Sequence, residues 1–165
     1  MENSMFYTWM ESPVGRLLLA ADEAGLRRIL FRGEPEKGWR EDPDALAETV
    51  QQLQAYFAGD RHEFDLPLAP EGTPFQLRVW RELCKIPYGT TISYGELARR
   101  VGSPNGSRAV GLANGANPIS IVVPCHRVIG SNGKLTGYGG GLENKQILLA
   151  LEKEHPLFAH QARAR

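Results

Sequence analysis

The pattern of the sequence changes at a short segment rich in Pro and Gly, residues 66–72, and this change limits the fold more than any other feature. Before the segment, three runs of apolar and β-prone residues alternate with turn sequences. These runs occupy residues 5–9, 16–21 and 26–31. After the segment, helix-capping signals predominate. The chain of 165 residues is therefore expected to be α/β (α+β), with a small N-terminal antiparallel-sheet domain and one helix in residues 1–71 and a mostly helical domain in residues 72–165.

A single helix is expected in the first half, after a polar loop at residues 32–42. Asp42 is its predicted cap, Pro43 lies in its first turn, and Gly59 marks its end. Its apolar residues recur at helical spacing and form one face: Leu46, Val50, Leu53 and Phe57. Residues 1–60 place no acids, bases or nucleophiles at a catalytic spacing, so we interpret this half as scaffold.

Short helices with N-terminal caps are expected at the start of the second half. Thr73-Pro74-Phe75-Gln76 combines an N-cap, a proline at the first helical position and a capping-box glutamine. Ser93-Tyr94-Gly95-Glu96 is a second capping box, and Ser107 can cap a third helix that ends near Ala116. The second and third helices, joined by a tight turn, have the outline of a helix-turn-helix, although any two short helices give the same outline.

The third of these helices is rich in small residues: Ala109, Gly111, Ala113, Gly115 and Ala116. Such a helix has little side chain to read bases in a major groove. Close packing between helices is one explanation for small residues. The other is a helix that enters the narrow minor groove of DNA, with Arg108 at its start able to enter the base stack and replace an extruded base.

The formal net charge is zero, but the charges are unevenly distributed. Residues 1–72 carry 7 basic and 14 acidic side chains, whereas residues 73–165 carry 12 and 5. A basic second half suits a polyanion such as nucleic acid, and chance variation in surface charge is the alternative. No apolar run approaches the roughly 20 residues of a membrane helix. Because no signal peptide is evident and two cysteines give no disulfide framework, we expect a cytoplasmic protein, associated with the nucleoid if bacterial.

Residues 119–129 hold the densest chemistry, an apolar run that we expect to form a strand delivering Pro124-Cys125-His126-Arg127. A buried cysteine is usually an inert small side chain, and a lone histidine is usually a core residue. Here a base and a cation lie beside the thiol, as a nucleophilic cysteine requires. A cysteine hydrolase is also conceivable, but adjacent residues rarely point at each other, so a bridging water or a backbone turn would be needed.

Two further segments accompany this run. The glycines of residues 137–141 surround Tyr138 and lack the Lys-Ser/Thr pair of a phosphate loop, so they more plausibly let the backbone approach a flat substrate. A final helix is expected at Leu142–Glu154, with its apolar side chains inward and Glu152 available to orient a histidine. The inward residues are Ile147, Leu148 and Leu151.

Pro124-Cys125-His126-Arg127-Val128 resembles the active-site motif of the O6-alkylguanine-DNA alkyltransferases, which repair DNA by moving an alkyl group onto their own cysteine. The resemblance covers residues 72–153 strongly and residues 1–71 by layout only. It extends through residues 72–76, 86–89, 108–111, 113–119 and 137–141.

The resemblance implies roles at the acceptor cysteine. Cys125 would accept the alkyl group, His126 would act through a water as its base, and Glu152 would orient His126. Asn117 would brace the turn near the cysteine, and Arg127 would support the local fold with hydrogen bonds.

The resemblance also implies contacts to the substrate and to DNA. Tyr94 would push on the phosphate of the flipped nucleotide and could offer its hydroxyl to the purine ring. The base pocket would be lined by Tyr138, the Gly139 amide and Lys145. The DNA-binding set would comprise Tyr94, Arg108, Ala109, Gly111, Ala113, Asn114 and Gly115.

The function implied is direct reversal of DNA damage. The protein would bind double-stranded DNA through the minor groove, flip out an O6-alkylguanine or an O4-alkylthymine, and transfer the alkyl group irreversibly, so that each molecule acts once. We expect a monomer with no cofactor and no metal, since the four His and two Cys show no zinc-ligand spacing and residues 1–60 contain neither residue type. Cooperative binding along DNA stays open.

Other functions are also compatible with parts of the sequence. A non-repairing protein that binds alkylguanine damage is the alternative within the family, and the presence of Cys125 argues against it because such proteins replace the acceptor cysteine. A cysteine hydrolase or a transcriptional helix-turn-helix protein is disfavoured by the adjacent Cys-His pair and by the helix poor in side chains.

Overall fold

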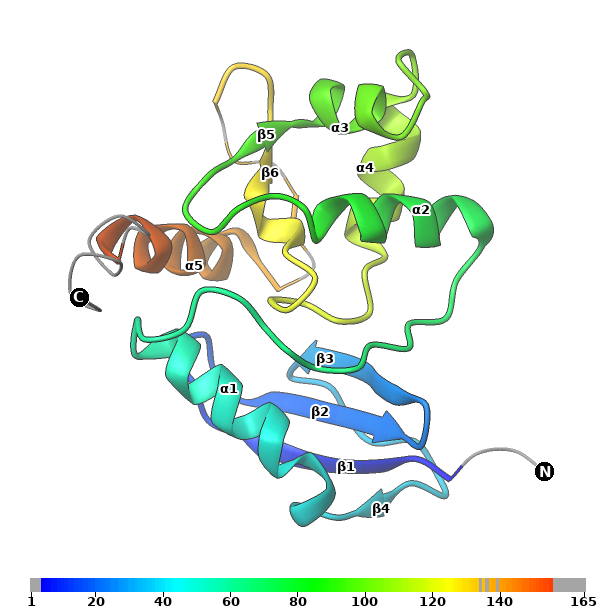
Figure 1. Ribbon diagram of the computed structural model, residues 1–165, viewed down its shortest axis with the longest axis vertical. Helices are drawn as coiled ribbons and strands as arrows, with labels where there is room; N and C mark the ends of the chain where they lie inside the picture. The colour runs from blue at the N-terminus through cyan, green and yellow to red at the C-terminus, as the bar shows by residue number, and fades with distance from the viewer. Residues whose placement is uncertain (1–3, 134, 136, 139, 156–165) are drawn as a thin grey trace.

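The computed structural model describes residues 4–133, 135, 137–138 and 140–155. A sheet covered by one long helix forms one layer, and a group of helices forms the other (Figure 1). The expected fold class, a small antiparallel sheet with a helix followed by a mostly helical part, is confirmed. None of the helices in this part of the chain is long and apolar enough to cross a membrane.

The sheet of the first layer has the strand order β3-β2-β1-β4. Strands β1 (Phe6–Met10), β2 (Leu17–Asp22) and β3 (Gly25–Phe31) pair antiparallel, each within one residue of its expected start. Strand β4 (Arg40–Glu41) pairs parallel with β1 and lies in the segment that was expected to be a loop. That expectation was wrong because β4 is two exposed polar residues, which join the sheet through backbone pairing alone.

Helix α1 (Ala47–Phe57) follows a short 3-10 turn, η1 (Asp44–Leu46). The expected apolar face is only partly right, because Val50 and Phe57 are half-buried while Thr49, Gln52 and Tyr56 are buried. Compared with the expected orientation, the helix is rotated about its axis so that polar side chains with hydrogen-bond partners are buried. Gln52 bonds the backbone of Asp65, and the Tyr56 hydroxyl reaches the second half of the chain.

Helix α2 (Pro74–Leu83) opens the second layer with the capping box expected from the sequence. The Thr73 hydroxyl accepts from Gln76 N at 3.1 Å, and the Gln76 side chain accepts from Thr73 N at 2.9 Å. At α3 (Tyr94–Arg100) only half of the expected box forms. Ser93 accepts from the backbone of Glu96, whose carboxylate pairs with arginines of the same helix, Arg99 and Arg100.

Helix α4 (Ser107–Gly115) begins one residue before the expected position. Gly106 is its N-cap, and Ser107 makes no capping hydrogen bond, so the prediction of a Ser107 cap was wrong. The preceding turn explains the shift. Gly106 N bonds the carbonyl of Ser103 at 2.7 Å, and this closes the turn directly onto the helix.

The expected strand at residues 119–129 does not form as such. Ile119 makes an isolated bridge to Ile29 of β3, and Ile121 adopts a left-handed φ of 75° that breaks extended structure. The run then turns into η2 (Cys125–Arg127) and β6 (Val128–Ile129), which pairs with β5 (Ile92–Ser93). A short apolar run buried on all sides carries no periodicity from which its conformation could be read.

Helix α5 (Leu142–Glu154) has the bounds expected from the sequence, and it lies near the end of α1 across the junction of the two layers (Figure 1). Leu148 is fully buried, while Ile147 and Leu151 are half-buried. Buried side chains from both halves form one continuous hydrophobic core. The division into domains 1–71 and 72–165 stays a prediction.

Candidate active site

Cys125 is the first residue of η2 and is 4% exposed. The Asn117 amide donates to the Cys125 Sγ at 3.1 Å and to the Val123 carbonyl at 2.8 Å, and its oxygen accepts from Ile119 N at 3.0 Å. A second amide, that of Asn114, donates to the Cys125 carbonyl at 3.3 Å. Two asparagines therefore hold the thiol and its loop in place.

The carboxylate of Glu152 lies at the centre of a buried hydrogen-bond network. Its Oε2 lies 2.7 Å from Nε2 of His126, which is fully buried. Arg127 donates to both carboxylate oxygens, at 2.9 Å to Oε1 and 3.0 Å to Oε2, and also to the Ile86 carbonyl at 2.7 Å. Gly89 N donates to Oε1 at 3.1 Å. The structure thus brings His126, Arg127 and Glu152 together as the sequence predicts.

The charges of this network set the proton positions. Burial alone would raise the pKa of Glu152, but the hydrogen bonds and charges of His126 and Arg127 outweigh it and hold that pKa well below its usual range. Burial lowers the pKa of His126, and Glu152 offsets this only in part. A neutral His126 facing an ionised Glu152 must donate from Nε2, which leaves Nδ1 with a lone pair. Nδ1 is buried and makes no hydrogen bond with a described residue.

The thiol of Cys125 rests in its protonated form. Burial raises its pKa, and the Asn117 hydrogen bond and the Lys145 charge lower it by less. Lys145 is fully buried and donates from Nζ to the Val128 carbonyl at 2.7 Å. A buried neutral thiol becomes a nucleophile only when a base takes its proton. His126, the residue that follows Cys125, has a nitrogen with a free lone pair, Nδ1, that could take this proton.

Tyr138 lies beside the Cys125 thiol. Its hydroxyl interacts with Cys125 and Ser120, and burial followed by the influence of Cys125 keeps its pKa above the usual value. Its ring packs edge-on against Phe31 of β3, with ring centroids 5.6 Å apart. Phe31 also limits the loop, because a Cβ on Gly140 would come within 2.5 Å of its ring. The expected amide contact of Gly139 lies outside the described residues.

The two halves of the chain meet at this site, and no sequence pattern indicates this contact. Tyr56 of α1 donates its hydroxyl to Glu152 Oε2 at 2.6 Å. Residues 1–60, interpreted from the sequence as scaffold, therefore supply two side chains, Tyr56 and Phe31, that contact residues of the candidate site. No local motif signals either residue. Tyr56 is separated from Glu152 by 96 positions, and only the fold brings them together.

The expected DNA-binding residues divide between two faces of α4. Arg108, Ala109 and Gly115 are exposed, and Gly111 is half-buried beside the ring of Tyr94, the half-buried first residue of α3. Ala113 and Asn114 are each 3% exposed, so their side chains face the interior of the protein, and their contact with DNA stays a prediction.

Packing explains the inward residues. The Ala113 carbonyl accepts from Trp80 Nε1 at 2.8 Å, and Asn114 bonds the Cys125 loop. Leu112, which the sequence analysis did not single out, is 73% exposed on the outer face of the helix.

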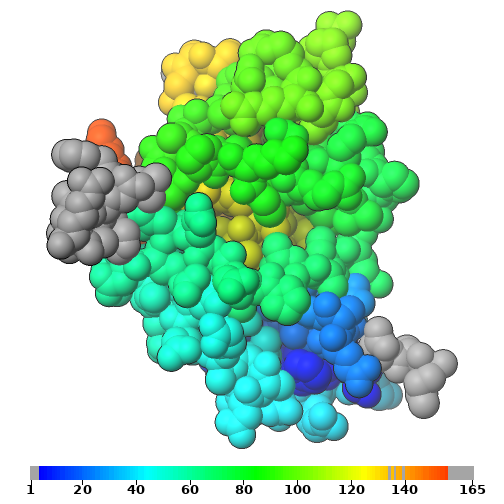
Figure 2. Space-filling view, viewed as in Figure 1, coloured from blue at the N-terminus to red at the C-terminus, as the bar shows by residue number. Residues whose placement is uncertain are grey.

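A separate hollow of about 470 Å³ lies between the linker that follows α1 and the loop that follows α2. Figure 2 shows it as a recess where the yellow segment is visible between the residues of the two halves. Its lining includes His62, Tyr88, Pro124 and Arg127, but neither Cys125 nor Tyr138. The hollow therefore borders the residues on either side of Cys125, and it is distinct from the base pocket expected around Tyr138.

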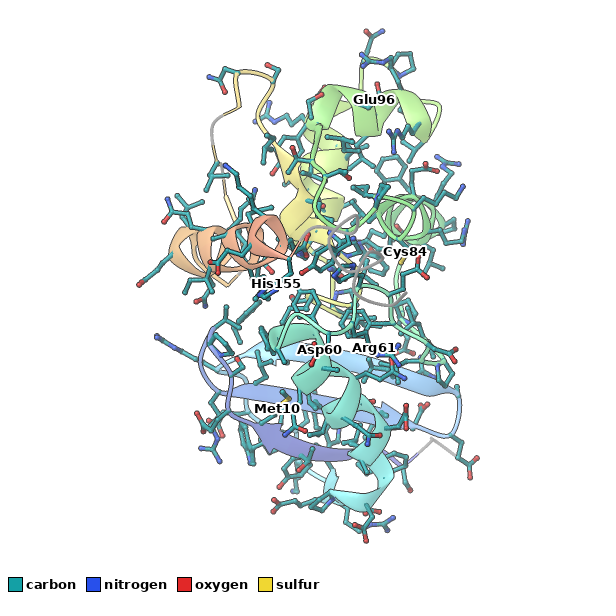
Figure 3. All side chains as sticks on the ribbon, turned by 60° about the vertical axis from the view of Figure 1, so that its left-hand side comes forward. Met10, Asp60, Arg61, Cys84, Glu96 and His155 are labelled. Carbon is teal, nitrogen blue, oxygen red and sulfur yellow. The ribbon has the colours of Figure 1, made fainter. Side chains whose placement is uncertain are left out.

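The second cysteine, Cys84, is exposed and lies at the end of α2, near the junction of the two halves (Figure 3). The described residues bring together no group of three or more His, Cys, Asp or Glu side chains that could hold a metal ion. The expectation that the protein uses no metal stays a prediction.

Comparison with known proteins matches both halves of the chain. Residues 5–70 match the ribonuclease-like domain of 6-O-methylguanine DNA methyltransferase, and residues 74–154 match the DNA binding domain of the same protein. Methylated-DNA--protein-cysteine methyltransferases are similar in sequence. That of Mycolicibacterium paratuberculosis is 58% identical over 90% of this chain and 93% of its own, and that of Methanosarcina acetivorans is 54% identical over 90% and 98%.

Solved structures agree with this result. The crystal structure of Mycobacterium tuberculosis OGT in complex with DNA is similar with a TM-score of 0.87 at 51% identity, covering 94% of this chain and 98% of that one. The Mycobacterium tuberculosis O6-methylguanine methyltransferase has a TM-score of 0.86 at the same identity, covering 92% and 94%.

Proposed function

Because the chain belongs to the 6-O-methylguanine DNA methyltransferase family and repairs DNA by alkyl transfer to a protein cysteine, we propose that it flips an O6-alkylguanine out of duplex DNA and transfers the alkyl group irreversibly to Cys125. The observation that carries this proposal is the buried Cys125 thiol, held by Asn117, in the residue that precedes a buried His126 whose Nε2 is fixed by Glu152. The same chemistry would act on O4-alkylthymine.

The reaction proposed is one displacement at carbon. His126 Nδ1 takes the thiol proton through a bridging water, and the Cys125 sulfur attacks the alkyl carbon as the bond from that carbon to O6 breaks. The electron pair of the broken bond goes to the guanine, which takes a proton from a nearby donor and leaves as the normal base. His126 passes the thiol proton back through water, and this proton restores the donor, so that His126 returns to its neutral form. Tyr94 and the ammonium group of Lys145 are the candidate donors that stabilise the leaving base.

The product explains why each molecule would act once. The carbon–sulfur bond of a thioether is stable, because an alkyl thiolate is a poor leaving group. The described groups around Cys125, which include the Asn117 amide and the His126 imidazole, supply no nucleophile suited to removing an alkyl group from sulfur. Turnover would end with S-alkyl-Cys125. No cofactor enters this scheme.

The DNA-binding face is proposed to be the exposed side of α3 and α4. Arg108 and Ala109 stand at the exposed start of α4, where a helix with short side chains can enter the minor groove and Arg108 can fill the space of the extruded base. Tyr94 at the start of α3 lies against this helix and would contact the phosphate of the flipped nucleotide. We propose that the protein binds as a monomer and works in the cytoplasm, at the nucleoid if bacterial.

The test is mass spectrometry of the intact protein after incubation with a duplex that contains one O6-methylguanine. The expected result is a gain of one methyl group per molecule, located at Cys125 by peptide mapping. Cys125→Ser should gain none while still binding the duplex, and Cys84→Ser, which removes the exposed thiol, should be labelled like the wild type.

Mass spectrometry of the intact protein also distinguishes the proposed function from the alternative, a protein that binds alkylated DNA without repairing it. A protein that only binds alkylguanine damage would shift the mobility of the duplex and keep its original mass. Labelling of Cys84 in place of Cys125 would overturn the assignment of the acceptor.

A further inference from the structure

We propose that Tyr56, in the N-terminal half, is a positioning residue for alkyl transfer: its hydroxyl fixes the Glu152 carboxylate that in turn holds His126. This inference rests on the proposed function. It assigns a part in the chemistry to a half of the protein that contains neither the acceptor cysteine nor the DNA-binding helices.

The geometry of the carboxylate supports this role. Glu152 receives hydrogen bonds from Tyr56, His126, Arg127 and Gly89, and the one from Tyr56, at 2.6 Å, is the shortest. Tyr56 and His126 bond the same oxygen, Oε2. The tyrosine therefore acts on the same oxygen as His126 and an Arg127 nitrogen, and among the described residues it is the donor to this carboxylate that comes from the first half of the chain.

Tyr56 is itself held rigidly enough to position a partner. It is fully buried, and its ring packs against the rings of Phe57, Phe64 and Tyr88, with centroids 5.3, 5.5 and 6.0 Å away. Burial and the charge of Glu152 raise its pKa well above the usual value, so the hydroxyl keeps its proton. An ionised carboxylate can only accept, and Tyr56 must therefore be the donor.

The consequence for His126 follows from the charge on Oε2. A donor on this oxygen withdraws negative charge from it, so the carboxylate stabilises a protonated His126 less. Arg127 and Lys145 also act on His126, because their positive charges disfavour its protonation. Without the Tyr56 hydroxyl, the pKa of His126 should rise and the ring should be less well oriented.

A purely structural tyrosine would behave differently. If the Tyr56 hydroxyl only joined the two halves, its removal would lower stability and leave the reaction of folded molecules unchanged. If it positions Glu152, its removal slows the reaction in folded molecules, moves the pH profile, and has no further effect once the carboxylate is gone.

The experiment measures single-turnover transfer from free O6-methylguanine base, which needs no DNA contact, between pH 5.5 and 8.5. The variants are Tyr56→Phe, Glu152→Gln, the double variant, and Tyr88→Phe as a matched control. Tyr88 packs against Tyr56 and is also buried, but its hydroxyl makes no hydrogen bond with a described residue. Circular dichroism gives the folded fraction at each pH, and sucrose, which favours the folded state, is added if Tyr56→Phe is partly unfolded.

The expected loss for Tyr56→Phe is about tenfold in rate, as for a hydrogen bond to a charged group, with the acidic limb of the profile moved to higher pH. Tyr88→Phe should stay within about twofold of the wild type, and Tyr56→Phe should cost nothing further in the Glu152→Gln background. A Tyr56→Phe rate and profile equal to those of Tyr88→Phe, or full additivity with Glu152→Gln, would overturn the inference. Absence of transfer by the wild type from both the free base and an O6-methylguanine duplex, in contrast, would overturn the proposed function.

Discussion

Replacing Glu152 by Gln removes the one negative charge of the buried network while keeping the size of the side chain. The Arg127 side chain is 6% exposed and the His126 side chain is fully buried, so neither can turn to solvent for compensation. Breaking a buried ion pair from one side typically costs about 3–5 kcal/mol, because the other charge stays buried without a partner. In a chain of this size 1 kcal/mol lowers the melting temperature by about 2–4 °C, which gives a loss of roughly 6–20 °C for Glu152→Gln.

Thermal unfolding followed by circular dichroism at pH 7 measures this loss. Glu143→Gln is the matched control, because Glu143 lies on the same helix and is exposed, so its effect should stay within about 0.5 kcal/mol. A Glu152→Gln protein as stable as the control would refute the view that this carboxylate holds the junction together.

Acid adds an independent check on the same residue. The pKa of Glu152 is depressed in the folded protein, whereas an unfolded chain has a Glu pKa of about 4.3. The stabilisation is therefore complete above about pH 4.3 and declines as the pH falls below that value. The stability difference between the wild type and Glu152→Gln should shrink between pH 5 and pH 3, and a constant difference would contradict the assigned protonation state.

Three more outcomes are expected. Arg108→Ala should slow repair of an alkylated duplex much more than transfer from the free base, and equal losses would show that Arg108 does not assist extrusion. In salt titrations of duplex binding, Arg99→Ala should reduce the slope of log K against log salt by about 1 if Arg99 contacts a phosphate, whereas Lys37→Ala in the acidic half should leave the slope unchanged. Gly140→Ala should lower the transfer rate and cost about 1–3 kcal/mol, because a Cβ there meets an aromatic ring of β3 at 2.5 Å, while Gly137→Ala, whose Cβ meets no described atom within 4 Å, should be neutral in stability and rate.

Features that depend on neighbours a few residues apart could be predicted from the sequence. The Thr73 capping box and both ends of α5 formed as expected, because their signals lie within one or two helical turns. The Cys-His motif likewise indicated the chemistry of the site, and the fold brings Glu152 to His126 as expected.

Features that depend on tertiary contacts could not be predicted. The segment before Cys125 reads as a strand, yet it turns at Ile121 because it is enclosed by both halves of the molecule. The bond from Tyr56 to Glu152 has no sequence signal, since any buried helix face can carry a tyrosine.

The small residues of α4 show a third kind of limit. Composition alone left helix packing and DNA contact as two alternatives, and the structure shows an inward and an outward face on the same helix. Ala113 packs against α2, while Ala109 and Gly115 are exposed. Small side chains carry no information about which way they point, so the sequence could not divide them between the two faces.

The bond between Tyr56 and Glu152 also bears on how the protein folds. Because non-local contacts form only after the entropy of closing the chain between them is lost, we expect this contact to form later than the local sheet hairpins and short helices. In the proposed mechanism, the network that would make His126 a base is therefore completed when α5 docks against α1. We therefore expect a collapsed chain in which this docking is incomplete to carry the proposed acceptor, Cys125, without its activating network.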